Sequence, residues 1–145
     1  MKKFLFALFA IFFIDQAIKI VFLNGFEFHT KCISLTLAIN KGIAFSMFEF
    51  LGEILKYIQL AIIFFLGYFF YKEKIISKYP IISGALFGAA LSNLIDRFIR
   101  DGVVDYFYWH CFFDFAIFNF ADTVIDITIA LLIYFHFIEK KEKIV

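Results

Sequence analysis

The acidic side chains within or beside strongly apolar sequence are the residues of this chain best suited to do chemistry. Asp122 and Asp126 fall inside an apolar stretch near the C-terminus, and Asp105 follows the apolar pair Val103-Val104. Apolar surroundings disfavour a charged carboxylate, so two such acids placed together would share one proton. The ionised acid can then activate water while the protonated acid polarises a carbonyl group, as in aspartic proteases. On spacing alone, however, a solvated loop acid is the better interpretation of Asp105.

Further polar residues gather in two other apolar stretches. Asp15 and Lys19 are spaced i,i+4 with the acid first, which is the favourable order for a helical ion pair. Mutual neutralisation is a simpler interpretation of this pair than direct catalysis. Asn93, Asp96 and Arg97 are spaced i, i+3 and i+4, so they share one helix face and can meet the other helices together.

A third polar face is predicted where the last apolar stretch begins. Asn119 and Asp122 share it, and Asp126 lies one turn further in. The three histidines show no paired metal-ligand spacing, and the sequence contains no HExxH or GxSxG motif. We therefore expect carboxylate chemistry without a metal or other cofactor.

Membrane helices must position these residues. The chain is 63% hydrophobic and only 19% charged, which is too little polar surface for a water-soluble domain. Four apolar stretches approach the roughly 20 residues that cross a bilayer core. They cover residues 4–23, 51–71, 79–99 and 115–138. Because unpaired backbone groups are too costly in hydrocarbon, we predict four helices in one all-α membrane domain covering 1–145.

The distribution of lysines predicts the orientation of these spans. Lysines precede the first span, separate the second from the third and follow the fourth: Lys2, Lys3, Lys72, Lys74, Lys78, Lys140, Lys141 and Lys143. The positive-inside rule places these segments, and hence both termini, in the cytoplasm. Residues 24–50 and 100–114 then face outward. A net charge of +1 and the lack of a clustered basic face argue against a nucleic-acid partner.

Three smaller features concern the ends and the packing of the spans. Lys2 and Lys3 followed by an apolar run are typical of a signal peptide, but no small-x-small cleavage site follows, so we expect an uncleaved anchor. Cys32 and Cys111 both fall in outward segments, where a disulfide and small apolar fillers are both reasonable interpretations. The spacing of Gly84-x-x-x-Gly88 marks a helix-packing face.

Five short blocks follow one another along nearly the whole chain. They read Asp15-Gln16-x-x-Lys19, Asn40-Lys41-Gly42-Ile43-Ala44-Phe45-Ser46, Ser92-Asn93-Leu94-Ile95-Asp96-Arg97, Gly102-Val103-Val104-Asp105 and Phe118-Asn119-x-Ala121-Asp122. In this order they resemble the blocks of bacterial lipoprotein signal peptidase, also called signal peptidase II. Members of that family are membrane aspartyl endopeptidases, which cleave prolipoproteins just before a cysteine that carries a diacylglyceryl group. The resemblance implies the same activity, a diacylated prolipoprotein as substrate, and contact with membrane lipid.

The resemblance also implies roles for particular residues. Asp105 and Asp122 become the catalytic dyad, which Asn119 would orient. Asn40 and Gly42 match the segment that lines the substrate groove.

The remaining implied residues support the site from other helices and from the outer surface. Asn93 and Arg97 match polar residues that face the groove, and Asp15 and Lys19 would support the site from the first helix. Residues 26–48 would form a short extended platform on the outer (periplasmic) face. We expect a monomer in the bacterial cytoplasmic (inner) membrane, with its active site facing outward.

Three positions depart from the family pattern. Ser92 stands where a glycine is usual, a change between small residues that should fit. Residues 115–118 lack a proline that the family often has, which leaves the start of the fourth helix less rigidly set. Asp126 is an additional acid, which would either pair with Lys19 or compete for the shared proton.

Two other classes of protein compete with the peptidase. A four-span proton-coupled carrier would use Asp96, Asp122 and Asp126 as relay sites. Carriers often have two similar halves and acids near the middle of the bilayer, and this sequence has neither. A structural subunit that assembles through the Gly84–Gly88 face would leave the acids unexplained. The peptidase is therefore the leading hypothesis.

Overall fold

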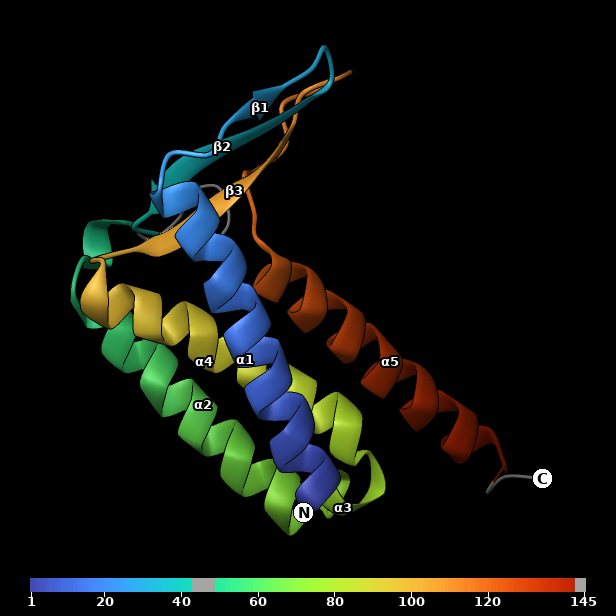
Figure 1. The fold of residues 1–145 in the computed structure, drawn as a ribbon. Coiled ribbons are helices and arrows are strands. Elements are labelled where there is room, and N and C mark those ends of the chain that lie inside the picture. Colours follow the sequence, from blue (N-terminus) through green and yellow to red (C-terminus); the bar gives the residue numbers. More distant parts are fainter. Residues whose placement is uncertain (43–48, 143–145) are drawn as a thin grey trace.

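The computed structural model describes residues 1–42 and 49–142 and contains, within them, four long helices and a small sheet (Figure 1). The long helices are α1 (Lys2–Leu23), α2 (Ile54–Lys72), α4 (Pro80–Ile99) and α5 (Phe120–Glu142). Each is long and apolar enough to cross a membrane. A 3-10 turn, η2 (Glu49–Leu51), precedes α2, and the short helix α3 (Ile75–Lys78) connects α2 to α4. The predicted fold class, a helical multi-pass membrane protein with a small extended platform, is confirmed.

The outward-facing side chains fit a lipid environment. Phe6 on α1, Phe64 on α2 and Phe137 on α5 are 77%, 71% and 65% exposed. A soluble protein rarely exposes so many large apolar groups together, whereas hydrocarbon accommodates them at no cost.

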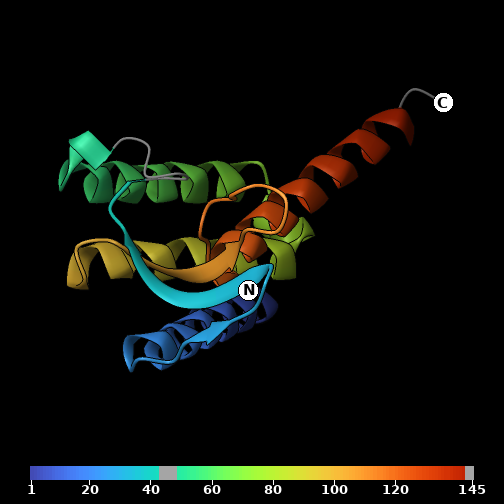
Figure 2. The same ribbon diagram turned by 90° about the horizontal axis from the view of Figure 1, so that it is seen from above.

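Helix α4 is the centre of the bundle. It lies between α1 and α2 and also contacts α5 (Figure 2). A Cβ atom added at Gly84 would lie 2.3 Å from the backbone oxygen of Phe4, and one at Gly88 would lie 2.3 Å from that of Leu8. The predicted small-residue packing face is therefore confirmed, and its partner is the backbone of α1.

The fourth span begins later than predicted, at Phe120 rather than at residue 115. Phe118 instead forms an antiparallel bridge with Phe107, in which backbone hydrogen bonds of 2.9 and 3.1 Å run in both directions. Asn119 then caps the helix: its Oδ1 accepts from the N–H of Asp122 (2.9 Å), and its own N–H donates to Asp122 Oδ2 (3.1 Å). This reciprocal pair is a capping box. The bridge and the cap fix the start of the helix without the family's proline.

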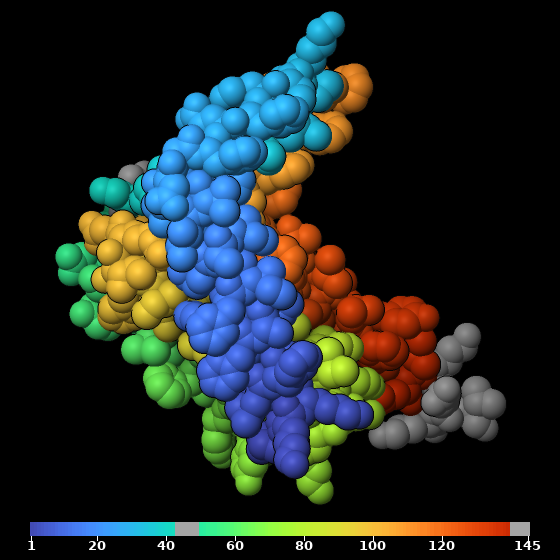
Figure 3. Space-filling model, viewed as in Figure 1, coloured from blue at the N-terminus to red at the C-terminus, as the bar shows by residue number. Residues whose placement is uncertain are grey.

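The sheet consists of three antiparallel strands in the order β1 (Phe28–His29), β2 (Ile33–Asn40) and β3 (Val103–Trp109). It lies across one end of the helices and projects beyond them, as the ribbon and space-filling views show (Figures 1 and 3). The predicted platform covered only residues 26–48, and the structure adds β3 to it; residues 43–48 lie outside the described part of the chain. Asp105 was expected in a loop and lies instead within β3.

The connection from α4 to β3 is tight. Asp101, rather than the glycine that follows it, takes the left-handed backbone conformation, with a φ of 60°. Gly102 is needed for close approach, because an added Cβ would lie 2.6 Å from Ile39 Cγ2 and 3.0 Å from Asn40 O. The connection therefore presses the start of β3 against the end of β2.

The far end of the sheet is held covalently. Cys32 and Cys111 form a disulfide bond, which decides between the two interpretations that the sequence left open. The N–H of His110 also donates to the backbone oxygen of Cys32 (2.9 Å). The segment after β3 is thereby tied to the start of β2.

The lysine-bearing segments lie toward the same end of the molecule, opposite the sheet, although the end of α5 splays away from the others (Figures 1 and 2). The N-terminus of α1, the short helix α3 and the last turns of α5 all lie at the end opposite the sheet (Figure 1). An even number of spans predicts this arrangement.

The close contact of α1 with α4 yields a first prediction. Gly88→Val should lower the melting temperature of the detergent-solubilised protein by about 5–10 °C, because the added side chain collides with the α1 backbone. Gly67→Ala is the matched control, since its Cβ would make an ordinary contact of 3.8 Å with the Phe87 ring. Equal melting temperatures for the two variants would contradict the packing described here.

Candidate active site

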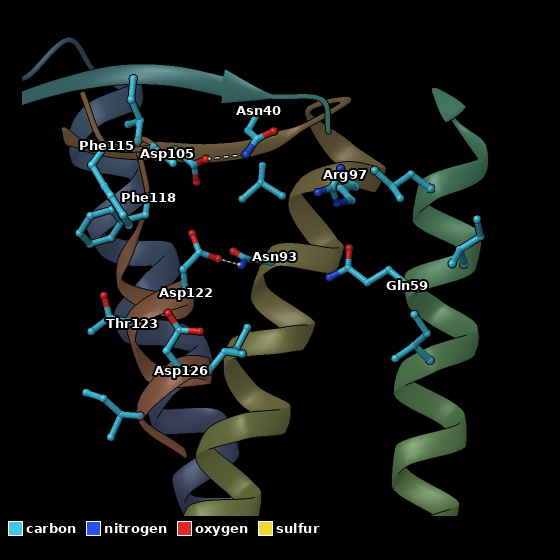
Figure 4. A pocket seen from close by; sticks show the side chains of 18 residues that line it. Asn40, Gln59, Asn93, Arg97, Asp105, Phe115, Phe118, Asp122, Thr123 and Asp126 are labelled. Carbon is cyan, nitrogen blue, oxygen red and sulfur yellow. Dashed lines mark hydrogen bonds between the residues drawn. The ribbon is translucent and has the colours of Figure 1, made fainter. Parts of the chain in front are cut away.

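Two carboxyl groups from different elements face one cavity (Figure 4). Asp105 comes from β3 and Asp122 from the first turn of α5. The cavity has a volume of about 660 Å³ and is lined by α2, α4, α5, the segment before α5 and the sheet. The two acids that the sequence predicted to meet therefore share one site.

Asp105 is held by two amide side chains. It is 2% exposed, and it accepts hydrogen bonds from Asn40 Nδ2 (3.0 Å) and Asn119 Nδ2 (2.7 Å). Asn40 pairs with Val103 across the β2–β3 ladder, and Val103 and Asp105 point to the same side of their strand. The strand register thus brings Asn40 to Asp105 diagonally.

Asp122 is held by a similar pair of donors. Asn93 Nδ2 on α4 donates to its Oδ1 (2.7 Å), and the backbone N–H of Asn119 donates to its Oδ2 (3.1 Å). Asn119 therefore contacts both acids, one with its side chain and one with its backbone. Its Nδ2 also lies 3.2 Å from Asn93 Oδ1, so the two asparagines connect the acids through one hydrogen-bonded network.

The electrostatic setting of Asp105 favours a proton on it near neutral pH. Burial, and next the nearby charge of Asp122, raise the pKa of Asp105 to about 7, against the opposing effect of the hydrogen bonds from Asn40 and Asn119. At neutral pH the site can therefore hold one protonated and one ionised carboxyl group.

Lys19 lies fully buried behind this network. Its Nζ is 2.7 Å from Asp15 Oδ2, 2.7 Å from Asp96 Oδ2 and 2.7 Å from Asn93 Oδ1. The predicted Asp15–Lys19 pair is confirmed. The sequence did not reveal Asp96 as its second partner.

Asp15 and Asp96, which pair with Lys19, each bind a backbone N–H group next to one of the acids that face the cavity. Asp15 Oδ1 accepts from the N–H of Ala121 (2.9 Å), the residue before Asp122. Asp96 Oδ2 accepts from the N–H of Val104 (3.2 Å), the residue before Asp105. Lys19 joins these two acids, and so it links the positions of β3 and α5.

Three polar residues complete the buried cluster. Ser92 Oγ donates to Asp15 Oδ2 (2.6 Å) and accepts from Gln16 Nε2 (2.9 Å), so this serine does more than fill the place of a glycine. Gln16 Nε2 also lies 2.9 Å from Asp96 Oδ1, to which Arg100 donates as well. The i,i+4 spacing of Asp96 and Arg100 is the sequence signal that could have revealed this part of the cluster.

Arg97 and Gly42 lie at the edge of the cavity. An Arg97 Nη donates to the backbone oxygen of Gly42, and the N–H of Gly42 donates to Asn40 Oδ1 (3.0 Å). Asn40, Asn93 and Arg97 line the cavity as expected, whereas Gly42 does not line it and only bonds to Asn40 and Arg97. The rest of the second block, Ile43-Ala44-Phe45-Ser46, lies outside the described residues.

Asp126 also lines the cavity, one turn along α5 from Asp122. The proposed pairing with Lys19 is not found, because Lys19 is surrounded by Asp15, Asp96 and Asn93. Within the described residues, no group of three or more His, Cys, Asp and Glu side chains is arranged to hold a metal ion.

A pair of hydrogen-bonded carboxyl groups can activate water and protonate a carbonyl oxygen. Together with four membrane helices, this arrangement defines a membrane aspartic peptidase. The sequence model of the family described as signal peptidase (SPase) II matches residues 7–138. The chain belongs to the signal peptidase II family.

Curated relatives and solved structures agree with this assignment. The chain is 51% identical to the lipoprotein signal peptidase of Sulfurimonas denitrificans over 128 residues, covering 88% of this chain and 82% of the relative. It is 47% identical to that of Helicobacter pylori strain P12 over 139 residues, covering 94% and 88%. A bacterial membrane enzyme solved at 2.3 Å superposes with a TM-score of 0.83 at 25% identity, covering 99% of this chain and 92% of that one. Another, solved at 1.9 Å, gives a TM-score of 0.76 at 26% identity, covering 92% of each. The carrier and structural-subunit hypotheses are set aside.

The hydrogen bond from Asn40 generates a prediction about pH dependence. In the parent protein, the peptidase rate should fall as pH rises through about 7, where Asp105 loses its proton. The Asn40 amide favours the ionised form of Asp105 and so lowers its pKa. Asn40→Leu should therefore raise that pKa and move the alkaline limb of the pH–rate profile to higher pH.

The matched control is Asn24→Leu, at the C-terminal cap of α1 and away from the cavity. This variant should keep the alkaline limb of the parent. An unchanged or lowered limb in Asn40→Leu would contradict the electrostatic account of Asp105.

Proposed function

We propose that this chain removes the signal peptide from diacylglyceryl-modified prolipoproteins, cleaving just before the lipidated cysteine, with Asp105 and Asp122 as its catalytic dyad. The observation that carries the proposal is the convergence of these two carboxyl groups on one cavity among membrane helices. The relatives named lipoprotein signal peptidase support the choice of substrate.

In the proposed mechanism, Asp122 acts as the general base and Asp105 as the general acid. Ionised Asp122 takes a proton from a water molecule, whose oxygen attacks the scissile carbonyl carbon. Protonated Asp105 gives its proton to the carbonyl oxygen, so the intermediate is a neutral gem-diol. Asp122 then passes its proton to the amide nitrogen, the C–N bond breaks, and one gem-diol hydroxyl returns a proton to Asp105. Both acids end in their starting states.

The surrounding residues keep this dyad in place. Asn119 orients both acids through its side chain and backbone, while Asn40 and Asn93 each hold one of them. Lys19, with Asp15, balances charge behind the site. Arg97 lines the cavity and donates a hydrogen bond to the backbone oxygen of Gly42.

The cavity suits a lipid-bearing substrate. Its wall includes aliphatic side chains from α2, namely Leu55, Ile58 and Ile62, and aromatic side chains from the segment before α5, namely Phe115 and Phe118. Apolar walls beside a membrane favour acyl chains and an apolar signal peptide over a soluble polypeptide. The substrate can reach the site from the bilayer without crossing water.

The proposed orientation places the sheet and the dyad on the outer side of the bacterial cytoplasmic membrane, with both termini in the cytoplasm. The lysine-bearing ends of the helices support it, because they all lie at the end of the molecule opposite the sheet (Figure 1). The lipidated cysteine of a prolipoprotein would emerge on that outer side, next to the dyad.

The dyad is tested by isosteric replacement. Asp105→Asn and Asp122→Asn should insert and purify normally, because asparagine has nearly the same shape and removes a buried charge. Each should lose roughly three or more orders of magnitude in the rate of signal-peptide release from a purified diacylated prolipoprotein.

The matched controls are Asp101→Asn and Asp114→Asn. Both residues are exposed, and asparagine also tolerates the left-handed conformation of residue 101. These variants should stay within about threefold of the parent. Substantial cleavage by the Asp122→Asn protein would rule out the mechanism.

The orientation is tested with fusions. An alkaline phosphatase, which is active only outside the cytoplasm, should be active when inserted next to Lys31 and inactive when fused after Val145. The reverse pattern would place the dyad on the cytoplasmic side and contradict the proposal.

A further inference from the structure

The wall of the cavity carries three polar side chains that the dyad and its supporting network do not use. They are Gln59 on α2, and Thr123 and Asp126 on α5. Figure 4 shows Gln59 on the side of the cavity opposite Thr123 and Asp126, with Asp126 further from the sheet than Asp122. Their neighbours along the wall are Ile58, Ile62, Ile125 and Ile127, so the polar groups stand out from an aliphatic surface.

These three side chains keep hydrogen-bonding capacity. Within the described residues, Asp126 makes no hydrogen bond or ion pair, and its side chain is exposed to the cavity. Gln59 Nε2 makes only a long contact of 3.4 Å with Ala90 O, and its Oε1 accepts nothing in the described part of the chain. Thr123 Oγ1 donates to Asn119 O at 3.3 Å, which leaves its oxygen free to accept.

Unused polar groups at this depth are costly. Carboxyl groups inside membrane helices are unfavourable, and they commonly mark a substrate path. An amide without a partner is unfavourable in the same way. A ligand with unpaired polar groups could form hydrogen bonds with these side chains, so that the groups of the ligand and of the protein would both gain partners.

The proposed substrate has such groups. A peptide bond can be attacked only where the chain is extended, yet a signal peptide in hydrocarbon keeps its backbone paired by being helical. Unwinding the residues before the scissile bond leaves their N–H and C=O groups without partners, which is unfavourable away from water. A membrane peptidase therefore needs polar partners next to the unwound segment.

The spacing of the helix fits this need. Asp126 is four residues beyond Asp122, which is about 6 Å along α5 at roughly 1.5 Å per residue. An extended peptide covers that length with about two residues, at roughly 3.3 Å each. A substrate strand running from the dyad along the cavity brings its second or third residue before the scissile bond next to Asp126.

We propose that Gln59, Thr123 and Asp126 form a binding subsite for the unwound backbone of the signal peptide, two to three residues before the cleaved bond. Asp126 accepts a backbone N–H of the substrate, and Gln59 pairs with the backbone from the opposite wall. The subsite rests on the proposed function, since it takes the same substrate, and it gives Asp126 a role in binding rather than in proton sharing.

An ester scan of the substrate tests this subsite. Single peptide bonds at the five positions before the cleavage site of a synthetic diacylated prolipoprotein are replaced with esters, which removes one N–H at a time. The full-length protein should lose about five- to tenfold in kcat/KM with an ester at the second or third position, and less elsewhere. Asp126→Val should lose about the same factor on the all-amide substrate and should no longer distinguish amide from ester there.

Two further variants complete the test. Asp126→Asn keeps a hydrogen-bond acceptor and should retain the amide preference and most of the activity. His136→Leu is the matched control, because it removes a polar group from the exposed surface of α5 outside the cavity, and it should behave as the parent. Asp126 makes no bond in the described structure, so its replacement should not lower the melting temperature.

The outcomes separate the two proposals. A parent protein that leaves the all-amide substrate uncut speaks against the proposed function itself. A parent that cleaves it, together with an Asp126→Val variant that keeps full activity and full ester discrimination, overturns the subsite. An Asp126→Asn variant as defective as Asp126→Val also overturns it, because Asp126 would then act through its proton.

Discussion

The buried ammonium group of Lys19 is the interaction on which the rest of the structure depends. A charge with no access to solvent is tolerated only when opposite charges and hydrogen-bond acceptors surround it, and Asp15, Asp96 and Asn93 supply them. The two carboxylates also accept hydrogen bonds from backbone N–H groups of β3 and α5. One cation thus connects two membrane helices, a strand and the start of a third membrane helix. The removal of Lys19 would leave the buried Asp15 without a cation and Asp96 with Arg100 alone.

This arrangement separates the buried ion pairs from the two acids that face the cavity, Asp105 and Asp122. The ion pairs lie behind the site, whereas the groups that contact Asp105 and Asp122 directly are the neutral amides of Asn40, Asn93 and Asn119 and one backbone N–H. An arginine or lysine in direct contact would hold both acids ionised. Amides position the carboxyl groups while leaving one of them able to keep a proton, as the raised pKa of Asp105 indicates.

Local features of the sequence were sufficient for much of the fold and the site. Apolar length predicted the four spans, the Gly84–Gly88 spacing predicted the close approach of α1 to α4, and the i,i+4 rule predicted the Asp15–Lys19 pair. The start of α5 was missed although its signal, a capping box at 119–122, is local. The strand that carries Asp105 could not be predicted locally, because β3 is a strand only by pairing with β2, which is far away in the sequence and separated from it by two membrane spans. The second partner of Lys19 was missed for the same reason, since Asp96 lies on another helix.

The same long-range pairing determines when the site can assemble during synthesis and membrane insertion. Asn40 can meet Asp105 only after α2 and α4 have entered the membrane, and Asp122 arrives with the last span. Asp105 and Asp122 therefore cannot face each other across the cavity until the final helix inserts. The pair of acids therefore depends on the insertion of every membrane span, the last one included.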